Sequence, residues 1–442
     1  MVEERRGQLD QFQQGEQRVN RRTHPGGAKP YEISKREVMA AWERVKRNQG
    51  SGGVDRMSLD EFEANLKNNL YKLWNRMSSG SYYPQPVRRV EIPKKDGRMR
   101  PLGIPTVYDR IAQEVARARL ERELEPIFHP DSYGFRPGKS ALQAVGVCRQ
   151  RNFEYSWAID LDIQKYFDTI NHELLLKAVR KHCKERWILL YIERWLKAPI
   201  KLPNGKMQEP TAGTPQGGVI SPLLANLFLH YVFDVWMQRK YPHARFERYA
   251  DDAIIHCRSE KEAIEILAAC QERFSECHLK LHPEKTRLAY CRDSYRRLRG
   301  HPITSYTFLG FLFRPRRMTS KRTGKRLTRF LPGAAPRAKK QIREKIRRKL
   351  HRRTLTKSLD DLLLSLNVVT EGWLNYFQPF SSAADLSDIA FYIRVRLTNW
   401  LANKFRWSLR RAITWLSLTL AREPSILTLP GTLSCGWSRR AV

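Results

Sequence analysis

The chain has 442 residues, of which 41% are hydrophobic and 29% are charged, and its formal net charge is +36 with a sequence pI near 10.2. It is long enough to bury a sizeable core divided among several packed subdomains. So large a positive charge destabilises a compact chain unless a polyanion neutralises it, so nucleic acid is the expected partner, ahead of a membrane surface. No apolar run is long enough to span a bilayer and no signal-peptide pattern is present, so we expect a cytoplasmic protein with no membrane partner. The seven cysteines are scattered without a C-x-x-C pair, which predicts reduced thiols and no zinc site.

The N-terminal part of the chain is polar before it becomes periodic. Residues 1–33 are rich in Gln and Arg, and we expect a flexible basic and polar tail there. A helix is expected to follow Ser34, which can cap it, because Val38, Trp42 and Val45 recur at helical spacing.

The next segment with a clear pattern predicts a hairpin. Val87–Ile92 and Met99–Ile104 have strand character, and the residues Lys95–Gly97 form a turn signal between them. Lys94 and Arg100 flank that turn. Such a hairpin can lean over a triphosphate, because arginine gives bidentate contacts and lysine a point charge. The alternative is an edge hairpin whose charges prevent edge-to-edge pairing.

An amphipathic helix is predicted over Thr106–Leu124, and a loop with the sequence SYGFRPGKS follows it at Ser132–Ser140. The loop is aromatic, basic and interrupted by Gly and Pro, and it contains Arg136 and Lys139. This composition suits contact with the backbone of a nucleic acid strand, although any ordered loop can have it.

The segment WAIDLDIQKYFD, which starts at Trp157, combines a strand pattern with acidic residues. Alternation places Trp157, Ile159 and Leu161 on one face of the strand. Asp160 and Asp162 then share the opposite face. A strand buried on both sides does not carry acids unless they are paired or hold a metal.

A glycine-rich turn precedes the next predicted helix. After helices expected over residues 172–197, the segment GTPQGGVISPLLAN contains Gly217 and Gly218, which allow close backbone approach. The helix is expected to start near Ser221 or Pro222. Such a turn can receive a base or a phosphate, but by itself it is weak evidence.

The segment RFERYADDAIIH places two adjacent acids between two strand-like runs. Phe246–Tyr249 and Ala253–Ile255 predict a hairpin with Asp251 and Asp252 at its turn. Adjacent carboxylates repel, so the pair is costly unless a cation neutralises it; a solvated turn is the alternative. If Asp162 faces this turn, the three acids make a site for Mg²⁺. Two such ions, about 3.5–4 Å apart, clamp the oxygens of an in-line phosphoryl transfer, so the pattern indicates nucleotidyl transfer.

Three shorter elements are expected next. Glu260–Glu276 predicts an amphipathic helix, and Leu279–Tyr290 predicts a strand, a turn and a strand with Lys285 near the turn. Thr307–Phe313 predicts a short pair of apolar strands.

Beyond Pro315 the composition becomes strongly basic. Residues 337–353 carry ten Lys and Arg against one Glu, with an apolar residue at every fourth position. This predicts a helix with one apolar seam and a cationic remainder that binds a phosphate backbone; a solvated face is the alternative. The candidate contacts are Arg337, Lys340, Arg343, Arg347 and Arg348.

Two aromatic-rich helices are predicted over Leu362–Phe377 and Phe391–Phe405. The second carries Trp400 and Lys404 and is followed by Arg406, a mixture of aromatic and basic residues that is typical of RNA-binding surfaces. The residues after 410 show no clear period.

The motifs IPKKDGRMRPLGIP, SYGFRPGKS, DLDIQKYFD, GTPQGGVISPLLAN, YADD, HPEKT and FLGF follow one another in this order. The series resembles bacterial group II intron reverse transcriptases over about residues 42–405. The resemblance implies an α+β, right-hand polymerase fold with fingers and a palm built on an antiparallel sheet, followed by a helical thumb and a helical maturase domain. We expect fingers and palm over 34–315, thumb and maturase domain over 316–406, and an extension without an HNH endonuclease over 407–442.

The resemblance also implies roles for single residues. Asp162, Asp251 and Asp252 correspond to the catalytic triad that binds two Mg²⁺ ions, with Asp160 as the second choice for Asp162. Lys285 is implied to protonate the departing pyrophosphate. The residues implied to bind the incoming deoxynucleotide are Lys94, Arg100, Phe167, Gln216 and Gly217.

Phe167 is the residue that favours DNA synthesis over RNA synthesis. It follows Asp162 by five positions, where reverse transcriptases place a bulky aromatic side chain beneath the sugar of the incoming nucleotide. A ring there would clash with a 2′-hydroxyl group. The resemblance therefore implies selection of deoxynucleotides.

The implied function is an RNA-directed DNA polymerase that binds its group II intron RNA and assists splicing and retrotransposition by target-primed reverse transcription. The implied partners are the intron RNA, an RNA template with a DNA primer, a DNA target and dNTPs, in a nucleoid-associated or RNP-associated particle, with a homodimer left open. Without an endonuclease, the primer would come from elsewhere, such as a replication fork. The alternatives are an RNA-folding maturase with incidental polymerase activity, and a domesticated reverse transcriptase in repair or phage defence.

Overall fold

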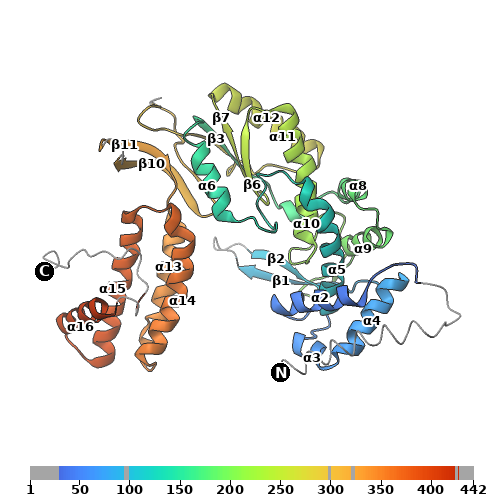
Figure 1. The fold of residues 1–442 in the computed structure, drawn as a ribbon, viewed down its shortest axis with the longest axis horizontal. Coiled ribbons are helices and arrows are strands. Elements are labelled where there is room, and N and C mark those ends of the chain that lie inside the picture. The colour runs from blue at the N-terminus through green and yellow to red at the C-terminus, as the bar shows by residue number, and fades with distance from the viewer. Residues whose placement is uncertain (1–28, 94–98, 297–299, 320–323, 424–426, 428–442) are drawn as a thin grey trace.

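The computed structural model describes residues 29–93, 99–296, 300–319, 324–423 and 427. The described part is a mixed α/β structure that ends in a helical C-terminal region (Figure 1). Three small sheets organise it, with strand orders β2–β1–β4–β5, β6–β7–β3–β8 and β11–β10–β9. The mixed architecture that the sequence indicated is confirmed. None of the described helices combines the length and the apolar character that crossing a bilayer requires.

The N-terminal unit packs helices beside the first sheet. Ser34 caps the first described helix, as the sequence predicted, and it does so through a capping box with Glu37. Trp42 stacks on Phe62 with ring centroids 5.0 Å apart. The elements are α2 (Lys35–Arg47), α3 (Leu59–Ala64), α4 (Leu66–Ser79), β1 (Val87–Pro93), β2 (Met99–Ile104), β4 (Ile200–Lys201) and β5 (Met207–Gln208).

The predicted hairpin over residues 87–104 is present. Strands β1 and β2 pair antiparallel, with Arg88 opposite Ile104 and Pro93 opposite Met99. The turn between them, which contains Lys94, lies outside the described residues.

The central sheet has one face covered by helices. The apolar side chains of Ile159, Phe246 and Ile255 lie on that face and share one buried core with the helices. Phe233 carries the contact to the sheet, since its ring centroid lies 4.9 Å from that of Phe246. The covering elements are α5 (Val107–Leu124), η1 (Glu125–Ile127), α8 (His172–His182), α9 (Arg186–Leu196), α10 (Ser221–Leu229), the π-helical η2 (His230–Asp234), α11 (Val235–Lys240) and α12 (Glu260–Glu276).

The opposite face of the central sheet begins a second core. Ala158, Ile254 and Ala289 pack there with the third sheet and with the end of a later helix. The elements are β3 (Trp157–Asp162), β6 (Arg245–Tyr249), β7 (Asp252–Cys257), β8 (Arg287–Tyr290), α6 (Ala141–Arg151), α7 (Tyr166–Thr169), β9 (Tyr306–Phe308), β10 (Phe311–Thr319) and β11 (Arg326–Leu331).

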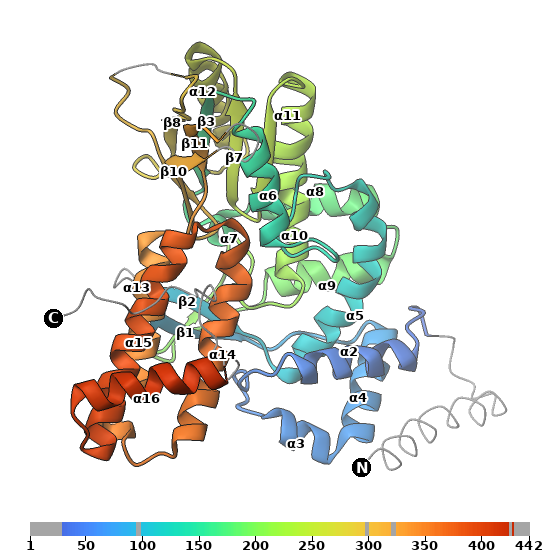
Figure 2. The same cartoon turned by 60° about the vertical axis from the view of Figure 1, so that its left-hand side comes forward.

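The C-terminal helices form a third core. The seam predicted for the basic helix is buried at Ile342, Ile346 and Leu350. Figure 2 shows these helices together in the lower left of the molecule. Their bounds are α13 (Pro336–Lys349), η3 (Arg352–Thr354), α14 (Leu359–Phe377), η4 (Gln378–Phe380), α15 (Ala383–Phe405) and α16 (Leu409–Arg422).

Two features of the C-terminal half differ from the expected domain limits. The limit at residue 315 falls inside β10, which continues to Thr319 and pairs with the unpredicted strand β11. The limit at residue 406 separates α15 from α16, although Ala412 and Leu416 of α16 are buried in the same core as α15. Burial of these apolar side chains joins α16 to the helical unit.

Candidate active site

The acidic residues predicted to converge lie on adjacent strands. β3 and β7 pair antiparallel, and the register places Asp162 directly opposite Asp252. Directly opposed residues of an antiparallel pair project from the same face of the sheet. Asp251 lies at the turn between β6 and β7, beside Ala250, which has a positive φ of 55°. The predicted hairpin and the predicted face of the strand are confirmed, and they bring the three acids to one sheet end.

The carboxyl groups of Asp160, Asp251 and Asp252 are buried close to other carboxylates, and both effects raise their pKa values. Burial, together with the neighbouring Asp252 and Asp162, raises the pKa of Asp160 to about 8. Burial and the neighbouring Asp251 and Asp162 raise the pKa of Asp252 to about 7. The pKa of Asp251 is also raised, chiefly by burial and then by Asp162. A cluster of carboxyl groups that resists ionisation is a site where a bound cation lowers the free energy of the charged form.

Lys285 provides the positive charge that the structure places nearest to Asp162. Its Nζ donates to both carboxylate oxygens, at 3.0 and 2.8 Å. Asp162 also accepts a backbone hydrogen bond at its carbonyl oxygen from His282, which holds the segment carrying Lys285 against the end of β3. The sequence expectation that Lys285 lies near a turn beside the acids is confirmed in position, and its role stays a prediction.

The donor set fits a hard divalent cation. Several carboxylates at one sheet end supply the oxygen ligands that Mg²⁺ prefers. Among the residues that the structure describes, only Cys148, Glu247 and His256 have ligand atoms that all lie within 4.8 Å of one another. Two of those three are paired with each other, since His256 Nε2 lies 2.7 Å from Glu247, to which Arg151 also donates. The ligand atoms of Asp162, Asp251 and Asp252 do not all lie within that distance of one another.

A hollow of about 590 Å³ lies beside the acids and collects most of the predicted nucleotide-binding residues. Arg100, Phe167 and Gln216 all line it. Gln216 Oε1 accepts from Arg100 Nε at 2.7 Å, and Gln216 Nε2 donates to Asp168 at 3.3 Å. Lys94, the fifth residue expected here, lies outside the described residues.

The backbone conformation and the close packing next to this hollow require glycine at position 217. Its φ is 121°, and a Cβ there would lie 2.3 Å from the carbonyl oxygen of Gly103. The neighbouring Gln216 carbonyl accepts from the Gly103 amide at 2.8 Å, which joins the turn to strand β2. Any side chain at Gly217 would separate the two segments.

A buried ion pair that sequence reasoning missed holds the acidic turn. Arg248 is 1% exposed and donates to both carboxylate oxygens of Asp234, at 2.7 and 2.6 Å. The same guanidinium donates to the Ala250 carbonyl in the turn at 3.0 Å and to Asn226 at 3.1 Å. Strand β6 reads RFERY and also carries Arg245 and Glu247, so the strand pattern did not single out Arg248.

The SYGFRPGKS loop also supports the acidic turn. Tyr133 N donates to the Arg248 carbonyl at 2.8 Å, and a Cβ at Gly134 would lie 2.4 Å from Ala250 N. Arg136 has an exposed side-chain fraction of only 6%, and it donates to Glu125 and to the carbonyls of His129 and Ser132. The guanidinium expected to contact nucleic acid is therefore occupied inside the protein. Lys139 is partly buried, and its Nζ donates to the Pro130 carbonyl at 2.9 Å.

The residues predicted for the RNA-binding surface divide into two groups. The structure contradicts Trp400 as a surface ring, because it is 3% exposed and belongs to the helical core. Lys404 caps a neighbouring loop, since its Nζ donates to the carbonyls of Leu355 and Lys357 at 2.8 and 2.7 Å. Arg343 pairs with Asp388 at 2.7 Å. The exposed members are Arg337, Lys340, Arg347, Arg348 and Arg406.

Two family models match the chain. Residues 92–313 match "Reverse transcriptase (RNA-dependent DNA polymerase)", a range that is half of the chain and contains the acids and most of the residues that line the hollow. Residues 339–415 match "Group II intron, maturase-specific domain", which contains most of α13 and reaches into α16.

Several curated proteins are similar over parts of their length. Protein YkfC of Escherichia coli is 32% identical over 281 residues, which is 55% of this chain and 73% of YkfC. The group II intron-encoded protein LtrA of Lactococcus lactis is 36% identical over 217 residues, 48% of this chain and 35% of LtrA. A putative COX1/OXI3 intron 2 protein of Saccharomyces cerevisiae is 31% identical over 267 residues, 60% of this chain and 30% of that protein. The chain thus spans about a third of the two intron-encoded relatives.

A solved structure of telomerase from Candida albicans is similar with a TM-score of 0.43 at 10% sequence identity. The match covers 79% of this chain and 70% of that chain, and it is too distant to support an assignment. The two family models and the relatives agree with the motifs and with the convergence of the acids. The chain belongs to the reverse transcriptase (RNA-dependent DNA polymerase) family and is a reverse transcriptase of the group II intron type with a maturase-specific domain.

Proposed function

We propose that the acids at the end of β3 and at the β6–β7 turn catalyse RNA-directed DNA synthesis with two Mg²⁺ ions. The observation that carries the proposal is the β3–β7 register, in which Asp162 stands opposite Asp252 with Asp251 next to it. Asp162 and Asp251 would be the principal ligands. When bound, such a pair of ions stabilises the attacking and leaving oxygens of an in-line phosphoryl transfer.

The protein's own groups orient the incoming nucleotide. Arg100 lines the hollow beside the acids, where its guanidinium is placed to contact a triphosphate, and Lys94 would act beside it. Phe167 lines the same hollow, and its ring would lie under the sugar and exclude a 2′-hydroxyl group. Gln216 and Gly217 would border the nascent base pair. Lys285 would protonate the departing pyrophosphate, since its ammonium already reaches the acids.

We also propose that the helical C-terminal region binds group II intron RNA and promotes splicing and retrotransposition. The support is the maturase-specific match over residues 339–415 and the exposed cations of α13. Phosphate contacts by such cations position a protein on RNA without reading sequence. In this scheme the N-terminal unit and the central sheet correspond to fingers and palm, and α13 begins the thumb. A DNA target, and a primer that another source supplies, complete the proposed reaction.

The test is primer extension on an RNA template with Mg²⁺ by a matched pair of variants. Asp251→Ala is expected to abolish cDNA synthesis, because it removes a principal ligand. Asp160→Asn is the control, since it lies two positions before Asp162 on the same strand face and keeps a neutral group in place of an acid whose pKa is about 8. Wild-type extension by Asp251→Ala, or equal loss in both variants, would refute the metal site.

A splicing assay separates the two proposed roles. Asp251→Ala should still promote splicing of the intron RNA at low Mg²⁺, because that activity depends on binding RNA and not on the acids. Loss of splicing in the same variant, with the fold intact by circular dichroism, would contradict the division of roles.

A further inference from the structure

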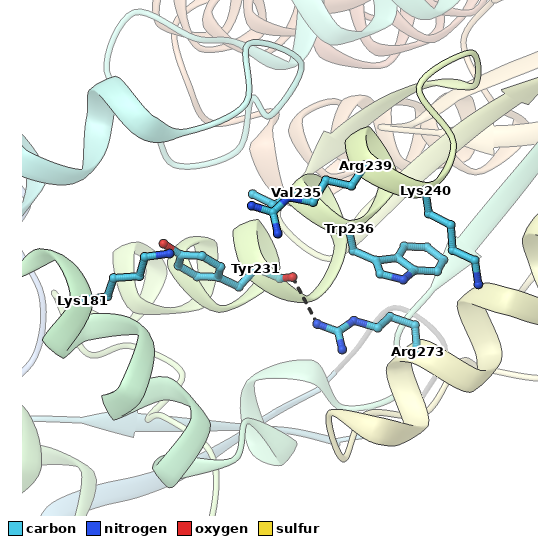
Figure 3. A pocket seen from close by; sticks show the side chains of 7 residues that line it. All are labelled: Lys181, Tyr231, Val235, Trp236, Arg239, Lys240 and Arg273. Carbon is cyan, nitrogen blue, oxygen red and sulfur yellow. Dashed lines mark hydrogen bonds between the residues drawn. The ribbon is translucent and has the colours of Figure 1, made fainter.

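A cation-rich pocket lies on the helix-covered side of the central sheet, away from Asp160 and Asp162. A hollow of about 480 Å³ is lined by seven described residues from three helical segments (Figure 3). Lys181 comes from α8 and Arg273 from α12. The remaining residues lie along the continuous run of η2 and α11, and they are Tyr231, Val235, Trp236, Arg239 and Lys240.

The pocket is separated from the catalytic acids by the sheet itself. The η2 segment packs on the face that carries Phe246, as the 4.9 Å contact of Phe233 shows. Asp160 and Asp162 alternate with Ile159 and Leu161 and therefore project from the other face. The pocket is thus a separate feature of the molecule and not an extension of the nucleotide site.

The lining combines positive charge with aromatic surface. Four of the seven residues are cationic and none of the seven is acidic. The Nζ of Lys181 lies 4.8 Å from the centroid of the Tyr231 ring, and the Nζ of Lys240 lies 5.7 Å from that of Trp236. Arg273 is held in place by the carbonyls of Tyr231 and Val232, at 3.4 and 3.2 Å. It also pairs with Glu276 outside the pocket.

The backbone at this point is irregular in a way that shapes the pocket. The five residues of η2 form a π-helix between the α-helical segments α10 and α11. A π-helical turn inserts an extra residue into a helix and is frequently found at functional sites. Tyr231 lies within this turn and Trp236 follows it in α11. Both rings are only partly buried, while Arg239 and Lys240 are exposed.

These observations determine the chemistry of the occupant. The Tyr231 ring is already stacked on His182, with centroids 5.8 Å apart. Cations alone would suit any polyanion, but the partly open indole of Trp236 is also available for a flat apolar group. An unpaired nucleotide offers both, because its base stacks on an aromatic ring while its flanking phosphates meet Lys and Arg. Double-stranded RNA would present only phosphates, since its bases are already stacked.

We propose that this pocket binds an unpaired segment of RNA, with one base against Trp236 and the adjoining phosphates on Arg239, Lys240 and Lys181. The inference rests on the proposed RNA partner and not on the polymerase site. It assigns to the helix-covered face of the sheet a contact with the structured RNA that the maturase domain would engage from the other end of the chain.

The experiment localises the contact by photocrosslinking. The full-length chain is first saturated with a primer–template duplex, and a single-stranded RNA 12-mer containing 4-thiouridine is then added and irradiated. We expect fragment-ion sequencing of the crosslinked peptide to place the link at Tyr231 or Trp236. The residue must be identified, because the tryptic peptide that holds both rings, residues 207–239, also contains Gln216 of the nucleotide site. The absence of a crosslink at both Tyr231 and Trp236 would overturn the proposal. Displacement of the 12-mer by a duplex RNA of the same length, as effective as displacement by the unlabelled single strand, would also overturn it.

Two sets of variants separate binding from folding. The exposed pair Arg239→Glu and Lys240→Glu should abolish the crosslink and lower the slope of log affinity against log salt by about 1.4, the value for two lost single-strand phosphate contacts. The control reverses an exposed pair at the start of α12, Arg258→Glu just before the helix and Lys261→Glu in its first turn, with the same change in net charge. Equal effects of the two pairs would show non-specific attraction and refute a pocket.

Trp236→Ala should weaken the 12-mer about 5- to 100-fold, the range measured for removing one base-stacking ring, and Trp236→Phe should restore most of it. Polyglutamate that competes as well as the 12-mer would refute base stacking. Primer extension by the Arg239→Glu and Lys240→Glu variant should equal that of the wild type. The outcome of the Asp251→Ala assay therefore has no bearing on the pocket.

Discussion

The acidic β6–β7 hairpin and the basic helix α13 both carry charged residues, but the two regions hold these residues in different ways. The β6–β7 turn is held by a fully buried ion pair between Arg248 and Asp234 and by the loop around Gly134. The cations of α13 are mostly exposed, and the apolar seam of Ile342 and Ile346 packs the helix against its neighbours. Two less exposed cations also hold it to α15, Lys339 by pairing with Asp385 and Arg343 by pairing with Asp388. The comparison shows two uses of charge. Catalytic groups must be held in a fixed geometry, which buried ion pairs and packing provide, whereas binding to phosphates depends on the number of accessible cations.

Breaking the buried support should have the largest effect. Asp234→Ala leaves Arg248 as an uncompensated buried charge, which typically costs about 3–5 kcal/mol of unfolding free energy. It also frees the Ala250 carbonyl and with it the position of Asp251. Denaturant unfolding and primer extension should both show the loss. An unchanged midpoint together with unchanged activity would show that the pair is not what holds the turn.

Phe167 tests whether the hollow beside the hairpin selects the sugar. Phe167→Val removes most of the ring that would meet a 2′-hydroxyl, so incorporation of ribonucleotides relative to deoxynucleotides should rise by about 10- to 200-fold. The measurement is single-nucleotide extension with matched rNTP and dNTP. A variant that loses both activities equally would indicate a packing role for the ring.

On α13 the effects should be smaller and additive. Lys340→Ala and Arg347→Ala each remove one exposed cation, and the salt dependence of RNA binding should fall by about 0.7–0.9 per residue. Arg343→Ala is the internal comparison, because Asp388 already occupies its guanidinium and little binding should be lost. A loss at Arg343 as large as at Lys340 would show that exposure does not decide the contribution.

The pH dependence of the metal-free protein tests the carboxyl cluster without any substitution. The pKa values of Asp160 and Asp252 are raised to about 8 and about 7 from 3.8, so the folded state binds more protons than the unfolded state between those limits. Stability in EDTA should therefore fall as the pH rises from about 4 to about 8. Mg²⁺ should restore more of the melting temperature at pH 8 than at pH 5, as differential scanning fluorimetry can measure. A melting temperature that rises over this range would contradict the raised pKa values.

The local pattern of the sequence was sufficient to predict much of the fold. The helix over residues 260–276 begins and ends as predicted because Ser259 caps it, and β3 shows the predicted alternation of its faces. The same alternation placed Asp162 toward the acidic turn, which is why the acids were found before the structure. These features depend on neighbours in the sequence.

The failures are features that depend on distant partners. Arg136 and Trp400 have the composition of a nucleic-acid surface, but Glu125 and the helical core occupy them. Arg248 was missed because its partner Asp234 lies on a helix, and the strand pattern gives no sign of it. Helix α16 was missed because its buried face is narrow, with only Ala412 and Leu416 buried.

The most direct test of the cation site is anomalous diffraction from crystals of the protein with primer–template, an incoming nucleotide and Mn²⁺ in place of Mg²⁺. We expect two anomalous peaks between the carboxylates of Asp162 and Asp251, and we expect Lys285 to be displaced from its ion pair with Asp162. Peaks confined to Cys148, Glu247 and His256, or bound nucleotide without any peak beside Asp251, would contradict this expectation.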